Sequence, residues 1–434
     1  TDVFQFMKDE GTFDTKTDNY TAAKGHTTAE NIVLNDTGKT TLAMTAAKNI
    51  TALNAIMNDA EGSVTAEITD PNGHLVAGTK RLTTTANDAI TVNLGTLNPT
   101  DTNLDEIKKL ADQTAAAGAG QGGVDAIKGS LTISAANITN KLKTFTNLTS
   151  DNNKINFTLD EEVAVGEAAA LIAKMHSSAT IDFAQGIKGA IGDLAKADGS
   201  AVSTELAAVL GKDPTVNIKV TDTVDTANEV KGLNVIRKGV TSGTITAGTV
   251  SIDSTAAAEF KTTAGFFDAE DPLTITISDA IDVATFNTLN GISNKNITLT
   301  AGLDDDLDKL ITGADTLSTG ASAANTQNGN GVKIKVKDAV DSASKIALLD
   351  DLATATSGVV TASVSGAASI NASLTNLKAT DKITFSISGD ATVADLAGLA
   401  GKTDKADISL GGNITGTDVF QFMKDEGTFD TKTD

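Results

Sequence analysis

Pairs of aspartates are the residues in this sequence whose type and spacing best suit chemistry. Three pairs share the pattern D-[AT]-[IV]-D-x-A, and they are Asp222 and Asp225, Asp279 and Asp282, and Asp338 and Asp341. Each pair lies where a β-branched run gives way to an Ala- and Leu-rich run. An Asp at such a junction accepts hydrogen bonds from the free N–H groups of the first helical turn and faces the positive end of the helix dipole. We favour this helix-cap interpretation.

The alternative for the same aspartates is a metal site. If repeated units stack in register, their carboxylates form a column of hard oxygen ligands, which suits calcium. A second acidic cluster, in "GLDDDLDKL", offers Asp304 and Asp306 as further calcium ligands, although a solvated turn explains this cluster equally well. The EF-hand loop and the glycine-rich calcium nonapeptide are both absent from the sequence.

Other chemical motifs have simpler explanations. Gly118, Gly120 and Gly123 spell G-x-G-x-x-G, but a helical pattern rather than a strand precedes them, so we expect a loop and no nucleotide cofactor. The three histidines are far apart, and no zinc or catalytic His motif is present. We therefore expect no catalytic residues and no enzyme activity, and calcium is the one cofactor that we consider.

A recurring phrase indicates the elements that position these residues. It consists of a short β-branched strand, an Asp- or Asn-bearing turn, an amphipathic Ala/Leu stretch with helical spacing, and a second Thr/Ile/Val strand after Gly. Seven copies begin near residues 42, 90, 155, 218, 275, 334 and 383. Because one copy cannot bury its own apolar faces, neighbouring copies must cover it. The pattern predicts a β-rich repeat protein, a parallel β-solenoid with a short helix inserted in each of about seven coils.

The two ends of the sequence are identical. Residues 1–18 and 417–434 both spell "TDVFQFMKDEGTFDTKTD", and the offset from Thr1 to Thr417 is 416 residues. This identity predicts a 416-residue unit that recurs head to tail. On this interpretation, residues 1–41 are the end of one coil and a linker, residues 42–416 are stacked coils of about 50 to 65 residues, and residues 417–434 start the next unit.

Composition excludes several classes of function. The formal net charge of −22 and the pI of about 4.5 disfavour nucleic acid as a partner, because the chain repels phosphate backbones. No apolar run approaches the ~20 residues of a membrane span, so we expect no membrane insertion. The chain has no Cys and only 3% aromatic residues, so small aliphatic side chains must fill its core.

The phrase "DAxDxAxxxxLxxL…SGxVTAxVSG", clearest from Asp338 to Gly366, resembles the Ala/Thr/Asp-rich repeats of giant tandem-repeat secreted bacterial surface proteins. These are the adhesin-like and cell-surface array or fibre proteins of marine bacteria and cyanobacteria. The resemblance implies secretion, display at the cell surface, and rigidity that depends on calcium. It transfers no functional residue.

Three functions follow from these observations as hypotheses. The leading one is a structural repeat unit of a long extracellular filament or cell-surface coat, whose partners are further copies of the same unit, joined head to tail covalently or noncovalently. The alternative is an adhesin stalk or surface-layer (S-layer) subunit, with cell-surface polysaccharide as a partner. The third is a polysaccharide-acting enzyme, which rests on fold analogy alone.

Overall fold

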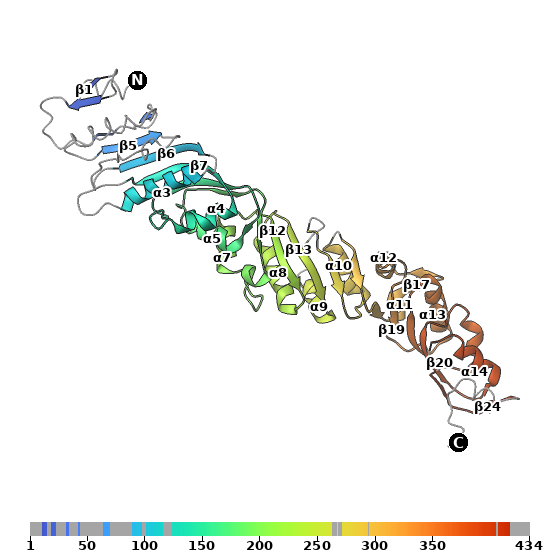
Figure 1. Cartoon of the computed structure of the whole chain (residues 1–434). Coiled ribbons are helices and arrows are strands. Elements are labelled where there is room, and N and C mark those ends of the chain that lie inside the picture. The colour runs from blue at the N-terminus through green and yellow to red at the C-terminus, as the bar shows by residue number, and fades with distance from the viewer. Residues whose placement is uncertain are drawn as a thin grey trace. The chain divides into compact units, whose positions relative to one another are not determined.

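A computed structural model shows the chain as two compact bodies, each treated separately below (Figure 1). The N-terminal body holds residues up to Leu194 together with 202–219 and 239–243, and the C-terminal body holds 195–201, 220–238 and everything from Thr244 onward. The structure describes residues 11–14, 19–22, 32–33, 42–43, 64–69, 89–97, 101–115, 124–262, 267, 271–293, 295–404 and 407–416.

Parallel strands dominate the N-terminal body. Its strands are β1 (Gly11–Asp14), β2 (Asn19–Ala22), β3 (Ile32–Val33), β4 (Leu42–Ala43), β5 (Val64–Thr69), β6 (Ala89–Leu97), β7 (Ala126–Ile133), β8 (Asn153–Leu159), β9 (Val163–Ala164), β10 (Ile181–Phe183) and β11 (Ile187–Gly189). One sheet has the order β10-β8-β7-β6-β5-β3, with β4 also paired to β5, and all these pairings are parallel. The strands β9 and β11 form a parallel pair, and β1 and β2 form an antiparallel hairpin.

Helices connect consecutive parallel strands of this body. They are α3 (Asp101–Ala115), α4 (Ala135–Asn140), the 3-10 helix η2 (Leu142–Thr144), α5 (Val165–Ile172), α6 (Ile191–Leu194) and α7 (Thr204–Lys212). Because paired parallel strands run in the same direction, the chain must cross back from the end of one strand to the start of its partner, and α3, α4 and α5 lie in such crossovers.

The C-terminal body repeats the same plan. Its strands are β12 (Ile218–Val224), β13 (Ile245–Ile252), β14 (Ile275–Ile277), β15 (Ile297–Leu299), β16 (Leu303–Asp305), β17 (Ile311–Gly313), β18 (Thr316–Leu317), β19 (Ile334–Val336), β20 (Val360–Gly366), β21 (Lys382–Ile387), β22 (Ala391–Thr392), β23 (Ile408–Leu410) and β24 (Ile414–Thr415). The strands β12 to β15 lie side by side in chain order, and a second sheet has the order β16-β19-β20-β21-β23. A short hairpin, β17-β18, and a parallel pair, β22-β24, complete it.

The helices of the C-terminal body again lie between consecutive strands. They are α8 (Ala227–Gly239), α9 (Ser254–Thr262), α10 (Val283–Gly291), α11 (Leu307–Leu310), α12 (Thr319–Gln327), α13 (Ala343–Ala355), the 3-10 helix η3 (Ala368–Ser373) and α14 (Val393–Ala400). In Figure 1 they follow the colour bar from green to red between the strands that they connect.

Strict alternation of apolar and polar residues explains how the strands pack. In β21, Ile383, Phe385 and Ile387 are buried, whereas Thr384 and Ser386 are exposed. Period-two alternation places these two sets on opposite faces of the sheet. One face therefore packs into the core and the other carries hydroxyl groups, which is unusual because parallel sheets are commonly covered on both faces.

Aliphatic side chains fill most of the core. The largest fully buried side chains include Phe145, Phe157, Phe286 and Phe385, and most of the other buried apolar residues are Ile, Leu, Val and Ala. In addition, Phe260 contacts Phe267 edge to face with ring centroids 5.7 Å apart.

The prediction of a parallel β-solenoid is wrong. The described parallel strands lie in several separate sheets with helices between consecutive strands, which is an α/β architecture, and none of these sheets forms a solenoid. Each sequence phrase from residue 90 onward contains two parallel strands that pair with each other across a helical crossover. In the second sheet, β19, β20, β21 and β23 accordingly begin at residues 334, 360, 382 and 408, at intervals of 22 to 26 residues.

Gly302 marks one break between sheets. The chain passes from β15 to β16 at this residue, which has a φ of 92° and lies against the backbone of Lys333. A side chain at this position would collide with the Lys333 carbonyl group, and the left-handed conformation strains any residue with a Cβ. The turn ends one sheet and lets β16 pair with β19 in the next.

The predicted starting positions fall within strands, and they lie in β4, β6, β8, β12, β14, β19 and β21. The predicted helical stretches are confirmed where Leu349 and Leu352 are buried in α13 and where Leu396 and Leu399 are buried in α14. The glycine motif at 118–123 and the terminal repeat copy at 417–434 lie outside the described residues.

Candidate functional site: polar contacts between strand–helix units

In each parallel sheet, the line of strand ends and the line of strand starts make different polar contacts, and we call these two lines the carboxyl edge and the amino edge. We call one strand with the helix that follows it a strand–helix unit. The carboxyl edge is where strands end and helices begin, and the amino edge is where strands begin. At both edges, backbone groups of one unit need partners, because the first N–H groups of a helix and the outward N–H groups at a strand start have none within their own element.

At the carboxyl edge, a carboxylate from the neighbouring unit accepts a hydrogen bond from the first N–H of a helix. The Val283 N–H of α10 donates to Asp305 Oδ2 at 3.0 Å, and the Leu307 N–H of α11 donates to Asp338 Oδ1 at 2.9 Å. Both carboxylates come later in the chain, Asp305 at the end of β16 and Asp338 just after β19. A negative charge at this position also interacts favourably with the helix dipole.

The N-terminal body has the same arrangement. The Ala135 N–H of α4, which follows β7, donates to Glu161 Oε1 at 2.6 Å. Glu161 follows β8, the strand paired with β7. The contact therefore recurs in both bodies, at the starts of α4, α10 and α11.

The helix-cap interpretation is confirmed at Asp282. This residue is the N-cap of α10, and its Oδ1 accepts a hydrogen bond from the Thr285 N–H at 2.5 Å. Its partner in the sequence pattern, Asp279, instead accepts hydrogen bonds from the hydroxyl groups of Ser254 at 3.4 Å and Ser278 at 3.3 Å. Ser254 begins α9, so Asp279 also reaches the preceding unit.

The pair before α13 behaves differently, because Ser342 is the N-cap of that helix. Asp338 binds the preceding helix, α11, and forms an ion pair with Lys345 at 2.9 Å, while Asp341 lies 3.8 Å from the same lysine. Burial raises the pKa of Asp338, but hydrogen bonds from Lys345 and Leu307 outweigh it and hold the pKa below its ordinary value. The hydrogen bond to Asp338 raises the pKa of Lys345.

The third pair also lacks a capping aspartate. Thr226 and Glu229 cap the start of α8, since the Glu229 N–H donates to Thr226 Oγ1 at 3.3 Å and Glu229 Oε2 accepts from the Asp225 N–H at 2.8 Å. The charge of Glu229 raises the pKa of Asp225. Asp222 lies within β12.

The acidic cluster that follows β15 is divided among separate partners. Asp304 forms an ion pair with Lys335 at 2.7 Å, and Asp305 binds α10 as described above. Asp306 occupies the N-cap position of α11, but its side chain makes no capping hydrogen bond. Asp308 pairs with Lys309 at 3.0 Å.

The described residues therefore do not bring the eight predicted calcium ligands together. Within the described ranges, no three His, Cys, Asp or Glu side chains are placed to share one metal ion. His176, in the same part of the chain, has its Nδ1 2.7 Å from Ser178 Oγ, and the other two histidines lie outside it.

At the amino edge, polar side chains that precede one strand accept hydrogen bonds from the start of the previous strand. The Val360 N–H of β20 donates to Asp381 Oδ1 at 2.8 Å, and the Ile383 N–H of β21 donates to Thr403 Oγ1 at 2.9 Å. The same contact joins the Ile245 N–H to Asp271 at 2.8 Å and, in the N-terminal body, Ile90 to Asp125 at 2.6 Å.

Two of these amino-edge carboxylates are completely buried. Asp381 also accepts from the Lys378 N–H at 2.8 Å through its second oxygen. The side chain of Asp271 is 1% exposed and forms an ion pair with Arg237, 11% exposed, at 2.9 Å. A buried carboxylate is tolerated only when it is hydrogen-bonded or paired, and both aspartates meet this requirement.

Sequence reasoning missed these buried aspartates, although a signal for them exists. Each comes shortly before a strand, in "DPLTITI" at Asp271 and "DKITFSI" at Asp381. An Asp before a β-branched run is usually a turn residue, and the local pattern does not show that its side chain turns inward.

Lysines make a third set of contacts, at the C-terminal ends of helices. Lys174, which follows α5, donates to the Phe145 carbonyl at 2.7 Å, and burial lowers its pKa. Lys212, at the end of α7, donates to the Ala179 carbonyl at 2.9 Å. Lys378 and Lys402 reach the Thr356 and Leu374 carbonyls in the same way. In each case the lysine comes from the later unit; Phe145, Thr356 and Leu374 are the C-cap residues of helices, whereas Ala179 lies in the turn before β10.

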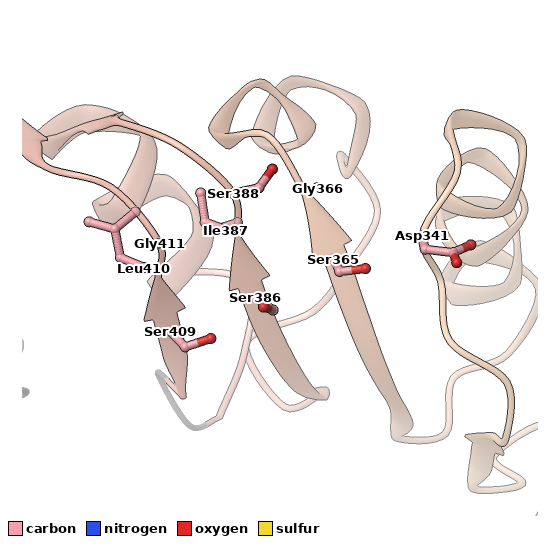
Figure 2. Close-up of a pocket in the computed structure, with 9 residues that line it drawn as sticks. All are labelled: Asp341, Ser365, Gly366, Ser386, Ile387, Ser388, Ser409, Leu410 and Gly411. Atoms are coloured by element: carbon pink, nitrogen blue, oxygen red, sulfur yellow. The ribbon is translucent and has the colours of Figure 1, made fainter.

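A cavity of about 540 Å³ opens at the carboxyl edge of β20, β21 and β23. Ser365, Ser386 and Ser409 lie in register across these three strands, and Asp341 stands at one end of the row (Figure 2). The other lining residues are Gly366, Ile387, Ser388, Leu410 and Gly411. The row offers hydroxyl groups and one carboxylate, so it suits hydrogen bonding to a polyhydroxylated molecule.

No protein-family model, curated protein or solved structure matches this chain. Within the described ranges, no helix has both the length and the apolar character needed to cross a membrane.

Proposed function

We propose that this chain is the structural repeat unit of a long extracellular filament or cell-surface coat and that it joins further copies of itself head to tail. One observation carries this proposal: strand–helix units in both bodies receive polar side chains from the unit that follows. Asp338 at the start of α11, Asp381 at the start of β20, and Lys212 beside the Ala179 carbonyl all come from the later unit.

Such contacts favour extension of the protein. A unit such as β21 with α14 both receives a group from its successor, Thr403, and supplies one to its predecessor, Asp381, so a further unit of the same kind adds the same contacts again. Stability of this type is a sum of unit and neighbour contributions. We infer that further copies of the whole sequence supply these units, and the identity of residues 1–18 with residues 417–434 supports this inference.

The chemistry of the chain fits a position outside the cell. The net charge of −22 keeps molecules apart except where they join through matched surfaces, and the lack of Cys makes folding independent of the redox compartment. The resemblance to secreted bacterial surface proteins supports the same location. In this proposal the partners are further copies of the chain, and no catalytic step is involved.

The test is the size of the protein isolated from its source, measured first in native form and then fully denatured. We expect native particles far larger than the 44.1 kDa of this chain. A denatured mass near a multiple of the 416-residue unit means a covalent array, and a denatured mass near 44.1 kDa means noncovalent assembly. Small native particles of a single chain, or a location inside the cell, contradict the proposal.

A second candidate function is an adhesin or surface-layer subunit that binds cell-surface polysaccharide. The serine row in the cavity favours it, because aligned hydroxyl groups with a carboxylate hydrogen-bond well to sugar hydroxyls. Binding of the full chain to a glycan array tests this function, with Ser386→Val as the test variant and Ser363→Val, which lies on β20 outside the cavity lining, as the control. Equal binding by the two variants contradicts a role for the cavity.

A further inference from the structure

The outer edge of β23 is open in the part of the chain that the structure describes. β23 ends the β16-β19-β20-β21-β23 sheet, and its only pairing among the described strands is with β21. The Phe385 N–H donates to the Asp407 carbonyl at 2.9 Å, and the Gly411 N–H donates to the Ile387 carbonyl at 2.8 Å. Because alternate residues of a strand bond to opposite sides, the N–H and C=O groups of Ile408 and Leu410 face away from β21.

The apolar core also reaches this edge. Phe385 and Ile387 are buried in β21, whereas their partners in register, Ile408 and Leu410, are only half-buried. An edge strand with free backbone groups and half-buried aliphatic side chains is a template for another strand. Lysine, proline or a bulge commonly blocks such an edge, and the sequence of β23, "ISL", has none of them.

The contacts inside the sheet show which kind of partner fits. Each inner strand of this sheet pairs in parallel with a strand that follows it in the chain, as β20 does with β21 and β21 does with β23. That following strand brings a polar side chain to the amino edge, Asp381 in one case and Thr403 in the next. A further strand–helix unit of the same protein continues this interface without change.

We propose that the β23 edge is the surface on which a second copy of this chain docks, through one of its strands aligned parallel to β23. This inference rests on the proposed function and assigns the joining surface to particular residues. The interface is heterologous, because the docking copy uses a strand other than β23. The β23 strand of the docking copy therefore keeps an open edge. Heterologous pairing of this type forms an open series and does not stop at a dimer. In a covalent array the docking copy is the next one along the same polypeptide.

The test uses the complete 434-residue chain and two lysine variants one residue apart. Leu410→Lys places a charge at the open edge, whereas the matched control Ser409→Lys places the same charge on the hydroxyl face of the same strand. Sedimentation velocity over increasing protein concentration measures association, and amide hydrogen exchange measures protection of Ile408 and Leu410. Far-ultraviolet circular dichroism and urea unfolding establish that each variant is folded. Ile408→Pro is a second edge variant, which removes one outward N–H and keeps the bonds to β21.

We expect the wild-type chain and Ser409→Lys to form a growing series of oligomers, with exchange at Ile408 and Leu410 slowing at least tenfold as concentration rises. Folded Leu410→Lys and Ile408→Pro variants are expected to remain monomeric. Two results overturn the inference: a wild-type chain that stays monomeric with concentration-independent exchange, or association that Ser409→Lys abolishes as fully as Leu410→Lys. Either result overturns only the assignment of the joining surface to β23. The proposed function is tested independently, by the size and location of the native protein.

Discussion

The two edges of the parallel sheets use the same residue type in opposite environments. At the carboxyl edge, Asp338 is 26% exposed and accepts a hydrogen bond from a helix N–H beside a lysine. At the amino edge, Asp381 is fully buried and accepts hydrogen bonds from two backbone N–H groups. Both side chains join one strand–helix unit to its neighbour.

The difference in burial between the two edges indicates which contacts contribute most to the stability of the neighbouring units. When an exposed carboxylate is removed, water can take its place as the hydrogen-bond partner, so the free energy of unfolding changes little. A buried N–H group whose acceptor is removed has no water to replace it and loses its hydrogen bond entirely. The sequence motif D-[AT]-[IV]-D-x-A marks the exposed edge. The buried edge, which carries less obvious aspartates, should contribute most of the stability.

The largest expected effect comes from Arg237→Met, which leaves the Asp271 carboxylate buried without its ion partner. We expect the free energy of unfolding to fall by about 4 kcal/mol at neutral pH, because an unpaired buried charge is costly. Urea unfolding of the variant and of the wild type measures this loss. Equal stability of variant and wild type would show that the pair is not buried as described.

Asp381→Ala should have the next largest effect. It removes the acceptor for the Val360 and Lys378 N–H groups, and we expect a loss of about 3 kcal/mol from two unsatisfied buried donors. Asp381→Asn keeps one carbonyl oxygen and should lose about half as much. A loss below about 1 kcal/mol for the alanine variant would mean that contacts at the amino edge contribute no more to the free energy of unfolding than contacts at the exposed carboxyl edge.

Asp282→Ala should have a smaller effect, because this residue caps α10 with a single hydrogen bond at the partly exposed carboxyl edge. We expect a loss of about 1 kcal/mol in unfolding free energy. The conservative variant Asp282→Ser can also act as an N-cap and should retain most of the stability. If Asp282→Ala proves as damaging as Asp381→Ala, the proposed contrast between the edges fails.

The ion pair of Asp338 and Lys345 predicts a small dependence on pH. The pKa of Asp338 is below its ordinary value, so its contribution is present above the unfolded pKa and disappears as the pH falls through the folded pKa. The pKa of Lys345 is raised, so its contribution disappears as the pH rises through the folded value. Asp338→Asn should flatten the acid side of the stability profile by less than about 1 kcal/mol. If the free energy of unfolding of Asp338→Asn falls with decreasing pH as steeply as that of the wild type, carboxylates other than Asp338 cause the acid dependence.

Calcium should have the smallest effect. The predicted ligands bind lysines, hydroxyl groups and backbone N–H groups in separate places, so we expect chelation to leave the unfolding free energy within about 0.5 kcal/mol of its value in calcium. Thermal unfolding with and without a chelator makes the comparison. Strong stabilisation by calcium would support the carboxylate column instead of the helix-cap interpretation.

Local elements were predictable from the sequence, but their partners were not. The helical spacing of leucines in α13 and α14 and the capping position of Asp282 depend on contacts within a few residues, which a short pattern encodes. The separation into several sheets depends on strand pairing across crossovers, and Gly302 shows how one close backbone approach ends a sheet. A short sequence pattern does not encode this contact, because Gly302 and Lys333 are far apart in the sequence.

The same distinction explains the candidate site. Asp338 was predicted to act on its own helix, but it binds α11, because the register between β16 and β19 places it beside the neighbouring helix start. Asp381 was missed for a related reason, since its burial follows from the strands on either side of it. The acceptor residues were visible in the sequence, and the identity of their donors depended on the tertiary fold.

The claim that strand–helix units receive polar side chains from the unit that follows is tested most directly by amide hydrogen exchange at Val360 in Asp381→Ala. The N–H of Val360 belongs to β20, whereas the substituted residue precedes β21. We predict that exchange at Val360 accelerates far more than exchange at Ile383, whose N–H is bound by Thr403. Unchanged exchange at Val360, or acceleration confined to β21, would contradict the account.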